Sequence, residues 1–267
     1  MTTKDKTFGL IGHPIKHSLS PALFKAGYDG RYPYELIETS DFEEAYQRFL
    51  DGYDGINITA PFKELAYHKA DILSDECRLI GATNLIVKTS EGTKAFNSDF
   101  LGVRLWLSEV TENYRTTPTV LVAGLGGAGK AAAMAAASLG FRLILMNRDM
   151  SKTESVAAKS DKEKTIICPL TEFKEAFREA DIIIYNIPTS IPQISELTDE
   201  DFKEQKHILE ANYKDPSFDN HLINRILKSN PKSCYTSGKT WLLYQALTGY
   251  EIFTGEKPDL AKMSALI

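Results

Sequence analysis

Cysteine is scarce in this chain of 267 residues, and the three present, Cys77, Cys168 and Cys234, lie far apart without a CxxC pair. This spacing excludes a disulfide framework and a cysteine-rich zinc site, and it favours a reducing, cytoplasmic compartment. The five histidines have no metal-ligand spacing either. We therefore expect no bound metal.

Long apolar runs are also lacking, because no stretch approaches the roughly 18 residues that a membrane span needs. The apolar stretch at 8–11 is too short for a signal peptide. The formal net charge is -5, whereas a nucleic-acid-binding protein usually carries a basic face. We expect a soluble, cytoplasmic protein with neither a membrane nor a nucleic acid as partner.

The chain does have a regular alternation of short apolar runs and amphipathic stretches. In its first part we expect strands at 8–12, 34–38, 55–58 and 83–87 and helices at 21–27, 41–51 and 62–73. This alternation is typical of α/β proteins in which helices cover both faces of a mostly parallel sheet.

A polar segment at 111–118 leads into a second α/β pattern. There we expect strands at 120–123, 142–147, 181–185, 207–211 and 233–235 and helices at 128–139, 151–158 and 241–248. The predicted fold class is α/β with two domains, an N-terminal α/β substrate domain and a Rossmann-type, doubly wound dinucleotide-binding domain. We expect the C-terminal helices to complete the first domain. The predicted boundaries are 1–103 plus 238–267 for the substrate domain and 104–237 for the dinucleotide-binding domain.

A glycine-rich loop follows the strand at 120–123 and opens the next helix. Gly124, Gly126 and Gly129 have the G-x-G-x-x-G spacing. Glycine at these positions permits a tight turn, a close approach of backbone amides to a pyrophosphate, and close helix–strand packing. Together with Gly127 and Ala128, these residues are the candidate cofactor-binding loop. The alternative is a glycine-rich turn without a ligand.

The end of the following strand indicates which dinucleotide is bound. Asn147 and Arg148 stand where an NAD-binding site usually has an acidic residue. The Arg148 guanidinium can hold a 2′-phosphate through two hydrogen bonds, and Lys152 adds positive charge, so we predict NADP. Asp149 keeps NAD as an alternative, because an acid can hold an unphosphorylated ribose. A surface Arg148–Asp149 pair that caps the next helix is the third interpretation.

Polar residues of the first domain gather at the ends of its strands, in the segments 12–21, 57–63, 81–84 and 97–99. Ligands of open α/β sheets lie beyond the carboxyl ends of the strands. The groups offered are hydroxyls, amides, one amine and one carboxylate, without a serine that has an obvious activating base. This set suits a small hydroxylated substrate.

Six motifs, in order along essentially the whole chain, resemble those of the shikimate dehydrogenase family. The pattern G-x-P-x-x-H-S-x-S-P begins at Gly12, N-[VI]-T-x-P-x-K at Asn57, G-A-x-N at Gly81 and N-[TS]-D-x-x-G at Asn97. The glycine-rich loop with its Asn-Arg strand end follows, and the segment that begins at Gly238 is similar to G-x-x-M-L-x-x-Q.

The chain departs from the family pattern at four places. Phe24-Lys25 stands where the family often has His-Asn, and Lys-Asp-Pro follows Tyr213 in place of Asn-Pro. The loop 186–190 lacks the usual Gly-Met, and Trp241 replaces a methionine. These changes bear on the edges of the nicotinamide pocket more than on the catalytic residues.

The resemblance implies that Lys63 and Asp99 are the catalytic pair. Reduction of a ketone needs a hydride and a proton, and an ammonium beside the reacting oxygen stabilises its negative charge and can deliver that proton. A nearby carboxylate fixes the lysine and hydrogen-bonds a substrate hydroxyl. Read alone, the lysine would be a solvated surface residue and the aspartate a helix cap.

The resemblance also implies a substrate-binding set. Ser18 and Ser20 would bind the substrate carboxylate, and helix N-capping is the other interpretation of both residues. Tyr213 would help to close over the carboxylate. The ring hydroxyls and the surroundings of the reacting oxygen would be recognised by Asn57, Thr59, Asn84 and Gln245, any of which could instead satisfy backbone groups at a strand end.

The implied activity is the reversible NADPH-dependent reduction of 3-dehydroshikimate to shikimate, in chorismate and aromatic amino-acid biosynthesis. The partner would be this small-molecule substrate, and the protein would be a monomer or a homodimer. One alternative is a quinate/shikimate dehydrogenase that uses NAD or NADP. The other is a non-catalytic sensor that binds shikimate or a nucleotide.

Overall fold

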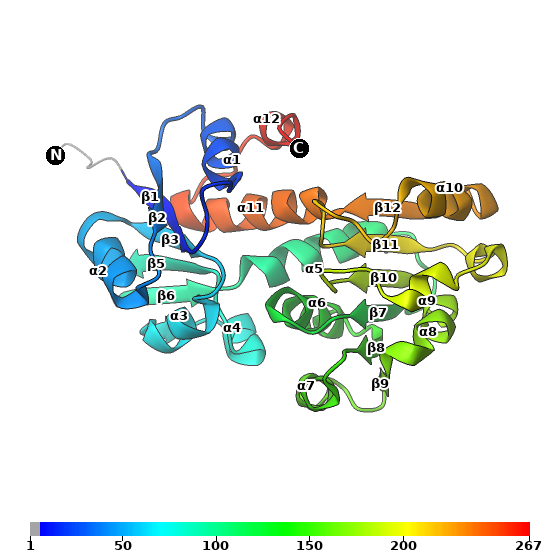
Figure 1. Cartoon of the computed structure of the whole chain (residues 1–267). Coiled ribbons are helices and arrows are strands. Elements are labelled where there is room, and N and C mark those ends of the chain that lie inside the picture. The colour runs from blue at the N-terminus through cyan, green and yellow to red at the C-terminus, as the bar shows by residue number, and fades with distance from the viewer. Residues whose placement is uncertain (1–5) are drawn as a thin grey trace. The chain divides into compact units, whose positions relative to one another are not determined.

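The computed structural model describes residues 6–267, and the first five residues of the predicted substrate domain lie outside the described residues. The chain divides into two compact units (Figure 1). Unit 1 comprises Met1–Gly102 and Leu243–Ile267, and unit 2 comprises Val103–Leu242. The divisions fall inside two helices, α5 (Ser98–Val110) and α11 (Gly238–Thr254).

Unit 1 contains a six-stranded sheet with the order β2-β1-β3-β5-β6-β4. The first three strands are parallel, and β5 runs antiparallel to both of its neighbours. The strands are β1 (Phe8–Gly12), β2 (Tyr34–Glu38), β3 (Gly55–Ile58), β4 (Ile72–Leu73), β5 (Leu85–Thr89) and β6 (Gly92–Phe96).

Helices pack on both faces of this sheet. On one face, Ile11 and Ile56 join a core with α2, α3 and α4. On the other face, Phe8 stacks on Phe253 of α11 and contacts Phe24 of α1. A fully buried phenylalanine stabilises the fold by about 1.5–3 kcal/mol relative to exposure. The remaining bounds are α1 (Ser20–Gly27), α2 (Phe42–Gly52), α3 (Lys63–Lys69), α4 (Asp75–Ile80) and α12 (Leu260–Ser264).

The segment 62–73, predicted as one helix, is a shorter helix followed by a strand. α3 ends at Lys69, and the chain then enters β4, which pairs with β6. The prediction was wrong because β6, the strand with which β4 pairs in parallel, was not recognised. Asp71 accepts hydrogen bonds from the Thr93 backbone and hydroxyl, both at 2.8 Å, and these bonds hold the chain against β6.

Unit 2 is a fully parallel six-stranded sheet with the order β12-β11-β10-β7-β8-β9. From β7 the chain builds outward through β8 and β9, then returns to the other side of β7 with β10, β11 and β12. This reversal is the topological switch point of a doubly wound fold, where dinucleotides bind. The strands are β7 (Thr119–Ala123), β8 (Arg142–Met146), β9 (Thr165–Cys168), β10 (Ile182–Tyr185), β11 (His207–Glu210) and β12 (Cys234–Ser237).

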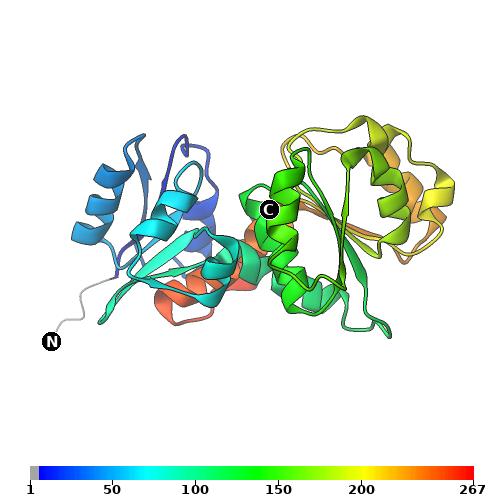
Figure 2. The same ribbon diagram turned by 90° about the horizontal axis from the view of Figure 1, so that it is seen from below.

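Helices cover both faces of the unit 2 sheet (Figure 2). Phe177 of α8 and Ile226 of α10 belong to one core with alternate strand residues such as Ile183. The alanine-rich α6, of high helix propensity, contacts β7, β8 and β10. The helices are α6 (Gly127–Ser138), α7 (Met150–Ala157), α8 (Phe173–Glu179), α9 (Pro192–Ser195) and α10 (Asn220–Ser229), with 3-10 turns η1 (Leu170–Glu172) and η2 (Asp199–Phe202). The predicted fold class is thus confirmed.

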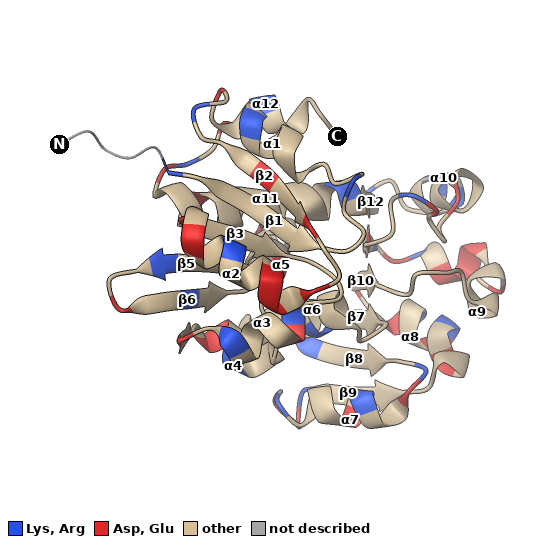
Figure 3. Cartoon of the chain, turned by 60° about the vertical axis from the view of Figure 1, so that its left-hand side comes forward, with Lys and Arg blue, Asp and Glu red and all other residues tan. Residues whose placement is uncertain are grey.

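Charged residues of both signs are interspersed along the helices and loops of the described chain (Figure 3). Within residues 6–267, no helix is long and apolar enough to cross a membrane. In the same residues, no group of three or more His, Cys, Asp or Glu side chains is arranged to hold a metal ion.

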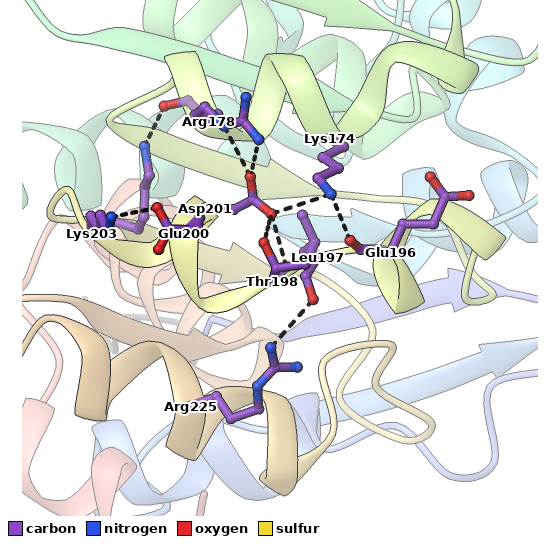
Figure 4. A network of polar contacts seen from close by, with 10 residues as sticks. Lys174, Arg178, Glu196, Leu197, Thr198, Glu200, Asp201, Lys203 and Arg225 are labelled. Atoms are coloured by element: carbon purple, nitrogen blue, oxygen red, sulfur yellow. Dashed lines mark hydrogen bonds and ion pairs between the residues drawn. The ribbon is translucent and has the colours of Figure 1, made fainter.

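A buried carboxylate ties η2 to α8 (Figure 4). The Asp201 side chain is fully buried, and it accepts hydrogen bonds from the Arg178 guanidinium at 2.6 and 2.9 Å and from the Thr198 hydroxyl at 2.9 Å. The Lys174 ammonium lies 3.7 Å away. Burial alone would raise the pKa of Asp201, but the hydrogen bonds from Thr198 and Arg178 outweigh burial and hold that pKa below its usual value.

Candidate active site

Lys63 and Asp99 form an ion pair in unit 1. The Lys63 Nζ lies 2.5 Å from Asp99 Oδ2, and the two side chains are 25% and 8% exposed. A charge-assisted hydrogen bond of this length in a partly dry setting is strong, because little water screens it. The lysine keeps enough exposure for its ammonium to meet a ligand.

Three local features position this pair. Lys63 is the first residue of α3, and its carbonyl accepts a hydrogen bond from the Thr83 backbone at 3.1 Å. Asn97 caps α5, because its Oδ1 accepts from the Phe100 backbone N–H at 3.1 Å. Asp99, in the first turn of α5, therefore does not serve as the cap, and its carboxylate is left for Lys63.

The two predicted amides are fixed by hydrogen bonds. Asn57 Nδ2 donates to the Asn84 carbonyl at 3.3 Å. Asn84 Oδ1 accepts from the Ser98 backbone N–H at 2.7 Å and from the Ser98 hydroxyl at 3.2 Å. Both lone pairs of that oxygen are therefore used, and Asn84 offers a ligand only N–H donors.

Gln245 on α11 lies beside this amide pair. Its Oε1 accepts from Asn84 Nδ2 at 3.5 Å, the limit of a hydrogen bond. Gly102 permits this arrangement, because a Cβ there would lie 2.6 Å from the Gln245 backbone nitrogen. Thr59 is partly buried in the turn after β3, where its backbone N–H donates to the Ile11 carbonyl at 2.9 Å.

Ser18 and Ser20 form a polar pair before α1. The Ser18 hydroxyl donates to Ser20 Oγ at 3.1 Å and accepts from the Ser20 backbone N–H at 3.2 Å. Leu19 holds the N-cap position of α1, and no side-chain cap hydrogen bond is made there. Ser18 therefore satisfies one backbone N–H at the start of α1, as the helix-capping interpretation expects, whereas no capping bond of the Ser20 hydroxyl is made at the N-cap.

A tyrosine that the sequence reasoning missed links these groups. The Tyr34 hydroxyl donates to Asn57 Oδ1 at 2.8 Å. Burial raises the pKa of Tyr34 well above its ordinary value, and the Ser20 hydroxyl opposes that rise slightly. The Tyr34 ring packs on Phe24 with ring centroids 4.8 Å apart. The departure at Phe24 is therefore part of the aromatic core beneath the site.

In unit 2, the glycine-rich loop has the geometry that a dinucleotide needs. A Cβ at Gly129 would lie 1.8 Å from the Gly124 carbonyl oxygen, so α6 starts closer to β7 than any side chain would allow. Around Gly126 and Gly127, in contrast, a Cβ would meet nothing within 4 Å. The loop is thus tight toward the sheet and open toward a ligand, and the start of α6 supplies N–H donors for a pyrophosphate.

The strand end that follows contacts the glycine-rich loop. Asn147 Oδ1 accepts from the Leu125 backbone N–H at 3.4 Å, which ties this strand end to the glycine-rich loop. Asp149 caps α7 and accepts from the Ser151 backbone N–H at 3.1 Å and hydroxyl at 2.7 Å. The Ser151 hydrogen bond lowers the pKa of Asp149. Arg148 is exposed on the surface beside this cap.

Of the other predicted residues in unit 2, Ala128 lies in the first turn of α6. Lys152 is exposed on α7. Tyr213 is partly buried in the segment between β11 and α10. The predicted catalytic and substrate-binding residues other than Tyr213 all lie in unit 1: Ser18, Ser20, Asn57, Thr59, Lys63, Asn84, Asp99 and Gln245.

The doubly wound sheet of unit 2, with its glycine-rich loop at the switch point, is the fold of nucleotide-dependent oxidoreductases. Two family profiles match the chain: "Shikimate dehydrogenase substrate binding domain" at residues 10–86 and "Shikimate / quinate 5-dehydrogenase" at residues 108–211. The chain belongs to the shikimate dehydrogenase family, and the predicted resemblance is confirmed.

Individual relatives agree with this membership. The chain is 31% identical to a shikimate dehydrogenase (NADP(+)) of Caldanaerobacter subterraneus subsp. tengcongensis, over 94% of this chain and 92% of that protein. It is 25% identical to the Thermus thermophilus shikimate 5-dehydrogenase solved with NADP(H) and shikimate, with a TM-score of 0.79 and 97% of each chain covered. A Corynebacterium glutamicum quinate dehydrogenase solved with NAD, at 22% identity, a TM-score of 0.83 and 98% of each chain covered, shares the fold.

Proposed function

We propose that this protein is an NADP-dependent shikimate dehydrogenase. It catalyses the reversible reduction of 3-dehydroshikimate to shikimate, a step of chorismate and aromatic amino-acid biosynthesis. The observation that carries this proposal is the 2.5 Å ion pair between Lys63 and Asp99, in the same unit as amides that are fixed by hydrogen bonds. The Thermus thermophilus relative, whose structure contains shikimate and NADP(H), supports the choice of ligands.

The substrate is held by hydrogen-bonding groups that match its chemistry. When substrate binds, the Ser18 hydroxyl gives up its bond to Ser20 Oγ, so that Ser18 and Ser20 both donate to the carboxylate, and Tyr213 helps to close over it. Asn84 donates an N–H to a ring oxygen, because its own carbonyl oxygen is already occupied by Ser98. The remaining contacts to the ring hydroxyls and the reacting oxygen come from Asn57, Thr59 and Gln245.

The cofactor is held by unit 2. Backbone N–H groups of residues 124–129 bind the pyrophosphate at the start of α6, where a Cβ at Gly126 or Gly127 would meet open space. Arg148 and Lys152 bind the 2′-phosphate, and Asn147 orients the loop. When bound, NADP(H) supplies or accepts the hydride.

Lys63 moves the proton. In the direction of reduction, its ammonium stabilises the negative charge that develops on the reacting oxygen and then protonates that oxygen. In the direction of oxidation, the neutral amine accepts the hydroxyl proton. Asp99 holds the Lys63 Nζ through its Oδ2, and its other oxygen is left to accept from a substrate hydroxyl.

The substrate and the cofactor are bound by different domains, with the predicted boundaries. Residues 1–103 plus 238–267 form the substrate and catalytic domain, and residues 104–237 form the NADP-binding domain.

The protein works in the cytoplasm as a monomer or homodimer. Three free cysteines, of which Cys77 is buried and Cys234 exposed, support a reducing compartment.

The direct test is an assay of the purified protein with shikimate or quinate and with NADP+ or NAD+, followed by the absorbance of the reduced nicotinamide. We expect the largest kcat/KM with shikimate and NADP+. A larger value with quinate would make the protein a quinate/shikimate dehydrogenase. Binding of shikimate without reduction in any of the four pairings would identify a non-catalytic sensor and overturn the proposal.

A further inference from the structure

Tyr34 belongs to none of the motifs, but its hydroxyl bonds one of the polar residues that the motifs predict. It donates to Asn57 Oδ1 at 2.8 Å. Its ring also packs on Tyr250, with ring centroids 6.1 Å apart, and the Tyr250 hydroxyl donates to the Ser20 backbone carbonyl at 3.0 Å. The Ser20 hydroxyl opposes the rise in the pKa of Tyr34 that burial causes. Tyr34 thus bonds a residue proposed for a ring hydroxyl and lies next to a residue proposed for the substrate carboxylate.

The hydrogen bonds of Asn57 determine which way its amide points. An asparagine amide has two N–H donors and one oxygen with two lone pairs. One N–H is given to the Asn84 carbonyl at 3.3 Å, and one lone pair accepts from Tyr34. In the reversed orientation, the amide oxygen would face the Asn84 carbonyl oxygen without a hydrogen between them.

With these two hydrogen bonds made, Asn57 retains one N–H and one lone pair for a ligand. A substrate hydroxyl is the group that uses both, because it accepts one hydrogen bond and donates another. Without the Tyr34 hydroxyl, the inner lone pair of Asn57 would be desolvated and unpaired, and the amide would turn to satisfy it.

We propose that Tyr34 is a positioning residue that orients the Asn57 amide toward a substrate hydroxyl and connects it to Ser20. The inference deepens the proposed function and rests on it. Tyr34 acts through Asn57 and Ser20, so it affects the binding of shikimate more than the proton transfer at Lys63.

The role of the Tyr34 hydroxyl can be tested separately from that of the ring. The ring contacts Phe24 and Tyr250, with centroids 4.8 and 6.1 Å away. Phenylalanine keeps these contacts and removes only the oxygen. The Tyr34→Phe variant is therefore expected to fold like the wild type.

The test is a double-mutant cycle with shikimate and NADP+, using Tyr34→Phe, Asn57→Ala and the double variant. For Tyr34→Phe we expect the KM for shikimate to rise about tenfold, as loss of one such hydrogen bond implies, while the KM for NADP+ stays unchanged. In the Asn57→Ala background, the same substitution should change the KM for shikimate by less than about twofold, because the two residues act as one unit.

The matched control is Tyr32→Phe, which removes a tyrosine hydroxyl two residues away that bonds Glu256 at 3.0 Å on the surface. Its KM values should equal those of the wild type. An unchanged KM in Tyr34→Phe, or an equal rise in KM with and without Asn57, would overturn the positioning role. A wild-type protein inactive with shikimate would overturn the proposed function itself, so the two failures are distinguishable.

Discussion

At the scale of single residues, we assign the choice between NADP and NAD to Arg148 and Asp149. The Asp149 carboxylate is engaged as the cap of α7, with two hydrogen bonds from Ser151. Both bonds end on Oδ1, so a ribose hydroxyl that displaced the cap would cost about 1 kcal/mol, and one that kept it would have to bond Oδ2. Arg148 is exposed and can turn its guanidinium toward a phosphate.

Arg148→Gln should therefore raise the KM for NADP+ by about 10- to 100-fold, because charge-assisted hydrogen bonds to a phosphate are worth roughly 1.5–3 kcal/mol. The KM for NAD+, which lacks the phosphate, should change little. Steady-state kinetics with each cofactor at saturating shikimate measure both values.

The matched control for this variant is Arg142→Gln, which changes an exposed arginine at the opposite end of the same strand, β8. Its kinetics should match the wild type with both cofactors. Equal losses of NADP+ and NAD+ affinity in Arg148→Gln would contradict a role in binding the 2′-phosphate.

The sequence could predict those functional residues that stand in a motif of neighbouring residues, but not those whose role depends on a distant contact. Lys63 and Asp99 each stand in a recognisable motif, and the structure joins them at 2.5 Å. Tyr34 stands in a strand where a tyrosine resembles any core residue. Its contact with Asn57 depends on the strand order, because β1 pairs with β2 on one side and with β3 on the other. No local pattern contains that information.

At the scale of elements, the buried Asp201 is a polar group of the second unit that is costly to disturb. It joins η2 to α8 through Arg178 and Thr198, and its side chain is fully buried. If the carboxylate is removed, the charges of Arg178 and Lys174 lose the opposite charge that offsets the cost of taking them partly out of water. The same carboxylate couples the stability of this unit to pH.

Asp201→Asn should lower the free energy of unfolding by about 2–3 kcal/mol at neutral pH. The folded-state pKa of Asp201 lies below its ordinary value, so the ionised group stabilises the fold above that value. This contribution is lost as the pH falls below about 4, so the difference between variant and wild type should shrink there. Urea unfolding at several pH values measures it.

Asp199→Asn is the control, because Asp199 lies in the same 3-10 turn with its side chain 70% exposed and paired to Arg225. Exposed ion pairs contribute about 1 kcal/mol at most. If both variants lost the same stability, burial of Asp201 would not be what makes its pair important.

Elements with strong local signals were predicted well, and those defined by a distant partner were not. The strand–loop–helix at 119–138 carries its own glycine and alanine pattern, and it forms as expected. The hairpin of β5 and β6 was missed, because β6 (Gly92–Phe96) has too few apolar residues to stand out. It becomes a strand by pairing with β4 and β5.

At the scale of the whole molecule, we assign substrate binding to unit 1 and cofactor binding to unit 2. The predicted substrate-binding residues other than Tyr213 belong to unit 1, and the predicted cofactor-binding residues belong to unit 2. A substitution at the proposed catalytic pair, Lys63 and Asp99, should therefore leave the binding of NADPH intact. This separation distinguishes loss of chemistry from loss of folding.

Lys63→Ala tests the central claim most directly, with kcat measured for shikimate oxidation and the Kd of NADPH measured by fluorescence. Loss of the proton carrier should lower kcat by about 10²- to 10⁴-fold while the Kd stays within about twofold of the wild type. Lys69→Ala, which changes an exposed lysine on the same helix that pairs with Glu43, should keep full activity. A Lys63→Ala variant with near-normal kcat would contradict the account, because the lysine would then have no part in the chemistry.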